Sequence, residues 1–143
     1  MYRVKLVMTF SLAGLVAGSA SALGQSAAAP TPHTIVVRLI EKGGAMPYAF
    51  EPANILAQRG DTVRFVEAAG AIHDVHFTVQ ARGARLGAAA TSPYFTAKGQ
   101  TYDLVIDQRF ADGTYEYVCE PHEAIGMKGT LVVKGVRGTA SIR

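Results

Sequence analysis

From residue 34 onward the sequence alternates between short runs of β-favouring residues and clusters of Gly, Pro, Asp and Asn. Runs of roughly four to eight such residues, bounded by turn formers, are typical of strands. No amphipathic helix separates them, which favours an all-β domain built as an antiparallel sandwich or barrel. We expect a loop over Ala81–Pro93 and strands at Thr34–Ile40, Asn54–Gln58, Thr62–Glu67, Asp74–Val79, Thr101–Ile106, Thr114–Cys119 and Thr130–Lys134.

The N-terminus has the order of features that is typical of a secretory signal peptide. Arg3 and Lys5 precede an apolar stretch, and an Ala-x-Ala cleavage sequence ends at Ala22. The stretch is shorter than the roughly 20 apolar residues that span a bilayer, so we expect cleavage, no membrane span and a periplasmic mature protein. We therefore predict a signal peptide at 1–22, a flexible lead-in at 23–33, one folded domain at 34–135 and a C-terminal tail at 136–143.

The mature chain is nearly neutral. Loss of Arg3 and Lys5 leaves 12 of the 14 Lys and Arg residues against 11 Asp and Glu, so the formal net charge falls from +3 to +1. Dense Lys/Arg runs interleaved with aromatic residues are missing from the sequence, so nucleic acid is not an expected partner. The mature length of about 120 residues is typical of one small domain.

Cys119 is the single cysteine of the chain. Exported proteins usually pair their thiols, so a lone one indicates a reactive or metal-binding sulfur, or pairing with another chain. The loop that follows it carries an imidazole at His122 and a thioether at Met127. This short segment therefore holds three kinds of metal donor.

The alternation of side chains indicates a second histidine as a candidate metal ligand. His73 has the same parity as Val75, Phe77 and Val79, the residues expected on the buried face of their strand. His76 has the opposite parity and is expected to face solvent. Cys119 lies at the end of another strand with an inward-facing parity. Antiparallel pairing of the two strands would therefore bring His73 and Cys119 to the same end of the sandwich.

Two imidazoles, a thiolate and a weakly bound thioether are the donor set of blue-copper sites. We predict one copper ion, cycling between Cu(I) and Cu(II), held by His73, Cys119, His122 and Met127. Zinc is the competing metal because Glu120 and Glu123 lie nearby, but zinc seldom uses a thioether. A cage without an open position favours electron transfer over substrate turnover, so we do not expect an enzyme.

The sequence resembles the cupredoxin family, and within it the plastocyanin and pseudoazurin branch. The resemblance covers nearly all of Ile35 to Lys134 and includes the loop spacing Cys-x-Pro-His-x-x-x-x-Met, the segment 69–77 around His73 and the strand 60–65. It implies a Greek-key β-sandwich of about eight strands, one copper ion and one-electron transfer between redox partner proteins. It also implies that His122 is the exposed electron port, with a docking patch formed by Ala124, Ile125 and Gly126.

Three residues depart from the family pattern. Asp74 stands where Asn is common, and Glu120 stands where a small hydroxyl residue is common. If the two carboxylates approach each other, like-charge repulsion raises the pKa of one, and we expect a visible spectrum or potential that depends on pH. Val118 replaces the aromatic residue that plastocyanins often have beside the cysteine. We therefore do not expect electrons to leave the protein through a tyrosine far from the copper.

Other readings stay open at this point. The same ligands could serve a periplasmic copper carrier or storage protein that binds Cu(I), or an accessory electron donor to an enzyme. Glu120, Glu123 and Lys128 are charged residues that could select the docking partner. The segment Met46-Pro47-Tyr48 is either a loop at the copper end or ordinary packing. We expect a monomer.

Overall fold

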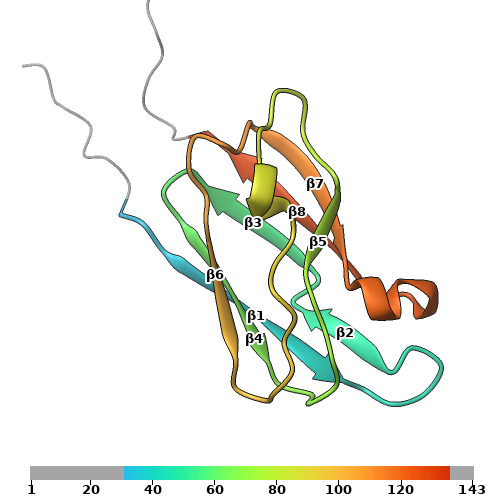
Figure 1. Ribbon diagram of the computed structural model, residues 1–143. Helices are drawn as coiled ribbons and strands as arrows, with labels where there is room; N and C mark the ends of the chain where they lie inside the picture. The colour runs from blue at the N-terminus through green and yellow to red at the C-terminus, as the bar shows by residue number, and fades with distance from the viewer. Residues whose placement is uncertain (1–30, 136–143) are drawn as a thin grey trace, which may run out of the picture.

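The computed structural model describes residues 31–135, which form two four-stranded sheets that pack face to face (Figure 1). One sheet has the order β2-β1-β4-β6 and the other has the order β3-β8-β7-β5. The strands are β1 (Thr34–Glu41), β2 (Tyr48–Glu51), β3 (Asn54–Gln58), β4 (Thr62–Glu67), β5 (His76–Val79), β6 (Thr101–Val105), β7 (Gly113–Val118) and β8 (Lys128–Lys134). The all-β sandwich of about eight strands is thereby confirmed.

Two short 3-10 helices complete the fold, η1 (Gly87–Ala90) in the connection from β5 to β6 and η2 (Glu120–Ile125) between β7 and β8. The predicted signal peptide at 1–22 and tail at 136–143 lie outside the described residues. Within 31–135, the structure has no helix whose length and apolar character would let it cross a membrane.

The strand pairing differs from a purely antiparallel sandwich. β1 pairs with β4 in parallel, and β3 pairs with β8 in parallel, whereas the other neighbours are antiparallel. Parallel pairs require the chain to cross from one sheet to the other, and no local pattern in the sequence signals such a crossing. β2 was not expected either, because a short strand next to Pro47 and Pro52 has few residues that show alternation.

The expected strand over Asp74–Val79 begins only at His76. Its pairing with β7 shifts register between Phe77 and Val79, and Val79 is 46% exposed. The expectation that Val79 shares the buried face is therefore wrong, because a register irregularity turns the strand beyond Phe77. The alternation holds for Val75 and Phe77, which are buried.

An aromatic cluster fills the space between the sheets. Tyr117 is fully buried, and its ring centroid lies 4.8 Å from that of Phe50 and 5.8 Å from that of Phe65. Its hydroxyl donates to the backbone oxygen of Ala53 at 3.1 Å, which satisfies the polar end of the ring. The cluster therefore ties β2 and β4 of one sheet to β7 of the other.

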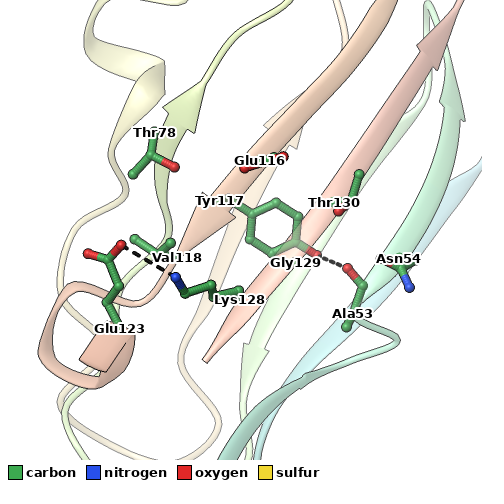
Figure 2. Close-up of a pocket in the computed structure, with 10 residues that line it drawn as sticks. All are labelled: Ala53, Asn54, Thr78, Glu116, Tyr117, Val118, Glu123, Lys128, Gly129 and Thr130. Carbon is green, nitrogen blue, oxygen red and sulfur yellow. Dashed lines mark hydrogen bonds and ion pairs between the residues drawn. The ribbon is translucent and has the colours of Figure 1, made fainter. Parts of the chain in front are cut away.

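Gly129 on β8 makes room for the Tyr117 ring, which lies next to it in Figure 2. A Cβ at Gly129 would lie 2.3–2.5 Å from three atoms of that ring. Overpacking of a filled core costs about 1–3 kcal/mol. We therefore expect Gly129→Ala to lower the free energy of unfolding by at least that amount in urea titrations.

The neighbouring substitution Thr130→Ala is the control, because Thr130 is only partly buried on the same strand. It should change the free energy of unfolding by no more than about 0.5 kcal/mol. If the two variants had equal free energies of unfolding, the ring of Tyr117 would be able to move away from the added methyl group without loss of stability, which would contradict this prediction.

Candidate metal centre

The two halves of the predicted site meet at one end of the sandwich. β5 and β7 are antiparallel neighbours, with His76 opposite Val118. Cys119 follows β7 directly, and His73 is held just before β5 by two backbone hydrogen bonds with Phe95, of 3.2 and 2.8 Å. The pairing thus brings His73 and Cys119 to the same end, as the alternation predicted. In Figure 1, η2 marks this end beyond β7.

The loop from Cys119 to Met127 closes on itself. The Cys119 amide donates to the oxygen of Met127 at 3.1 Å, the His122 amide donates to the oxygen of Cys119 at 3.0 Å, and the Met127 amide donates to the oxygen of His122 at 3.2 Å. Gly126 ends η2 with a φ of 90°, a conformation that glycine adopts without strain. These bonds fix three of the four predicted ligands in one tight turn.

The side chains at this end are close together and shielded from water. Sγ of Cys119 lies 3.4 Å from Nδ1 of His122, and the ring centroids of His73 and His122 are 4.8 Å apart. His73, Cys119 and Met127 are fully buried. Nε2 of His73 is buried without a hydrogen-bond partner. Such atoms are rare in folded proteins, and a free imidazole nitrogen here fits a metal ligand.

Burial also sets the protonation of these groups. It raises the pKa of the Cys119 thiol to about 11. It lowers the pKa of His122, and the neighbouring His73 lowers it further. The metal-free site at neutral pH therefore holds a neutral thiol and a neutral His122 ring. The ring can offer a lone pair at once, whereas the thiol must release its proton when a metal binds.

Within residues 31–135, no three His, Cys, Asp or Glu side chains are already gathered at metal-binding spacing. The predicted donors nevertheless share one end of the fold. Their chemistry, two nitrogens and two sulfurs in a buried setting, fits copper. The surface depression drawn in Figure 2 lies over β7 and β8, and none of the four predicted ligands lines it.

The segment Met46-Pro47-Tyr48 lies at this end of the molecule. The ring centroid of Tyr48 is 5.1 Å from that of His73 and 4.2 Å from that of His122. Sδ of Met46 lies so close to Gly126 that a Cβ there would be only 2.9 Å away. Met46 and Pro47 precede β2 and Tyr48 begins it, so the structure favours the interpretation that this segment lies at the predicted copper end.

Asp74 links the two ligand segments. Its Oδ1 accepts a hydrogen bond of 2.7 Å from the amide of Glu120. Burial raises the pKa of Asp74, and the negative charge of Glu120 raises it further. The pKa of Asp74 thus shifts in the expected direction, with burial as the larger cause, and the pH dependence of the visible spectrum or potential stays a prediction. Glu120 itself is engaged by His76 and by the Tyr94 hydroxyl, so His76 is paired at the surface.

Sequence reasoning missed Glu67. Its carboxylate is buried and lies 2.8 Å from Nδ1 of His73. The signal was present in the alternation of β4, where Glu67 has the parity of the buried residues Val63 and Phe65. A charged residue at an inward position of a strand is uncommon and indicates a specific partner.

Residues 31–134 match the profile of a family described as copper binding proteins, plastocyanin/azurin family. The chain belongs to this family. Plastocyanin from Scenedesmus fuscus is 36% identical over 102 residues, which are 70% of this chain and 99% of the relative. Chloroplastic plastocyanin from Tetradesmus obliquus is 36% identical over 121 residues, which are 83% of this chain and 75% of the relative.

Solved structures of cupredoxins have the same fold. The oxidized plastocyanin of Dryopteris crassirhizoma superposes with a TM-score of 0.57 at 26% identity, covering 69% of this chain and 99% of that one. A pseudoazurin from Sinorhizobium superposes with a TM-score of 0.53 at 30% identity, covering 73% and 76%. These relatives confirm the plastocyanin and pseudoazurin branch. The cupredoxin is thus a blue copper electron carrier that binds one copper ion and passes electrons to protein partners, and it is not an enzyme.

The hydrogen bond from Glu120 to Asp74 gives a stability prediction for the metal-free cupredoxin. Asp74→Ala removes the acceptor and leaves a part-buried amide unpaired, so we expect a loss of about 1–3 kcal/mol in the free energy of unfolding. Asp74→Asn keeps an oxygen at Oδ1 and should lose less. Urea titrations of both variants at one pH provide the measurement, and equal losses would contradict the linking role.

Proposed function

We propose that this cupredoxin shuttles single electrons between periplasmic redox partners through one copper ion held by His73, Cys119, His122 and Met127. The observation that carries the proposal is the meeting of these side chains at one buried end of the sandwich. Copper bound there supplies a one-electron couple between Cu(I) and Cu(II). The N-terminal pattern of an export signal supports the periplasmic location.

Each of the four side chains has its own role in the proposed centre. Cys119 releases its proton to become a thiolate, while His73 and His122 offer ring nitrogens. Met127 adds a soft thioether that is fully buried. Because three of the four donors lie away from solvent, water and small substrates have little access, which suits electron transfer.

The proposal includes docking of partner proteins around His122, where the residues of the expected patch, Ala124, Ile125 and Gly126, are exposed. His122 is half-buried, and the exposed side chains of Met46, Ile72 and Ile125 belong to segments that adjoin the predicted ligands. An apolar patch of this kind suits the small, short-lived interfaces of redox partners. Glu123 and Lys128 form an ion pair of 3.8 Å beside it and contribute to partner selection. The proposal includes a monomer as the working state.

Substitution of single ligands tests the copper site. Cys119→Ser should abolish the intense visible thiolate-to-copper absorption of the copper-loaded protein, because the serine oxygen cannot supply that transition. His73→Ala should weaken or abolish it as well. His76→Ala is the matched control, since this imidazole pairs with Glu120 at the surface, and it should keep the colour. A coloured Cys119→Ser protein would overturn the assignment.

The same preparation separates an electron carrier from a copper carrier or storage protein. We expect repeated oxidation and reduction at an electrode to leave the copper bound. Release of Cu(I) to a chelator on each reduction would instead favour the copper-carrier alternative.

Electron self-exchange between two copies tests the docking patch without a known partner. Ile125→Asp places a charge in the patch of both copies, so we expect the self-exchange rate from NMR line broadening to fall by about tenfold at an unchanged reduction potential. Val105→Asp is the control, because Val105 is 47% exposed but pairs with Thr62 at the other end of β4. Equal rates in the two variants would contradict the patch.

A further inference from the structure

Tyr48 is the first residue of β2, and its backbone is held firmly in place. It pairs with Glu41 at the end of β1. The backbone oxygen of the preceding residue, Pro47, accepts a hydrogen bond of 2.6 Å from the amide of Lys42. Two residues further along the strand, Phe50 is buried in the core. The position of the Tyr48 ring is therefore set by the sheet that contains β1 and β2.

The imidazole of His122 is less enclosed than that of the other histidine in the proposed ligand set. His122 lies in η2 and is half-buried, whereas His73 is fully buried. Hydrogen bonds fix the backbone of the loop around His122, but they do not set the torsion angles of its side chain. The outer torsion of a histidine has broad preferences. The ring therefore needs a contact from outside the loop to keep one orientation.

Three side chains lie against the imidazole of His122. Sγ of Cys119 is 3.4 Å from its Nδ1, and the ring centroid of His73 is 4.8 Å away. The third is Tyr48, whose ring centroid lies 4.2 Å from that of His122 with an angle of 39° between the planes. The ring of Tyr48 also meets His73 edge-on, at 5.1 Å and 76°. Of the three neighbours, Tyr48 is the one that is not itself a proposed ligand.

We propose that Tyr48 is a positioning residue that holds the half-buried ring of His122 in the orientation that copper needs before the metal binds. The proposal rests on the function proposed above. A site whose ligands are already oriented binds its metal without first ordering them, and that orientation depends on the side chains packed behind the ligands. Met46 adds a second contact from the same segment, because its thioether packs against Gly126 at the end of η2.

Two substitutions separate the aromatic ring of Tyr48 from its volume. Tyr48→Phe keeps the ring, whereas Tyr48→Leu fills much of the same space without an aromatic face. In NMR of the metal-free wild type, we expect the ring current of Tyr48 to shift the ring protons of His122 upfield, and carbon relaxation to show an ordered imidazole. Tyr48→Phe should keep both signals. Tyr48→Leu should remove the upfield shift and raise the population of other His122 orientations by about two- to tenfold, the equivalent of one aromatic contact.

Copper affinity provides a second readout. Tyr48→Leu should weaken the binding of Cu(II) and of Cu(I) alike, by about two- to tenfold, because the ring of His122 must be ordered for either ion. The reduction potential should therefore stay unchanged. A loss confined to one oxidation state would overturn the positioning role. Tyr102→Leu is the matched control, because Tyr102 is a half-buried tyrosine on β6, at the opposite edge of the same sheet, and it should change neither readout.

The measurements on the metal-free protein keep this proposal separate from the proposed function. A wild-type protein that binds no copper would defeat the function but leave the NMR comparison decisive for Tyr48. An imidazole of His122 that is as ordered in a folded Tyr48→Leu protein as in the wild type would overturn the positioning role. Where Tyr48→Leu does not fold, ring protons of His122 without an upfield shift in the wild type would overturn it.

Discussion

The pairing of β7 with β8 is the constraint on which the proposed centre depends. Val118 lies opposite Lys128 in this pair, and the next residues inward along the loop, Cys119 and Met127, share a backbone hydrogen bond. The two sulfurs are therefore fixed at the mouth of a hairpin, and His122 occupies the turn between them. β5 lies on the other side of β7, so the chain that enters it delivers His73 to the same place.

The second sheet contributes the surroundings of the centre rather than its sulfur donors. Tyr48 of β2 packs against the rings of both histidines, and Glu67 of β4 binds one of them. The ring of His122 cannot rotate without displacing Tyr48, and the ring of His73 cannot rotate without displacing Tyr48 or Glu67. Both of these side chains belong to the sheet that does not carry the His122 loop. A site restrained from both sheets changes little in geometry as charge changes, which suits rapid electron transfer.

The sequence predicted the parts of the fold that depend on local pattern. Alternation placed β3 and β4 with correct bounds, and fixed offsets from Cys119 identified the loop that closes at Met127. The parallel pairs β1–β4 and β3–β8 depend on chain crossings between sheets, which no local pattern encodes. Glu67 was missed although its parity marked it as buried, because the partner that explains a buried charge lies in another segment.

The placement of unsatisfied polar atoms argues that this end of the molecule is shaped by function. The two buried side-chain atoms without partners within residues 31–135 are Nε2 of His73 and Oδ2 of Asp74, which are neighbours in the chain. Asp61, buried elsewhere, has both oxygens hydrogen-bonded to backbone amides. A fold selected for stability alone would satisfy or remove such atoms. Their position beside Cys119 and His122 fits the proposed metal site.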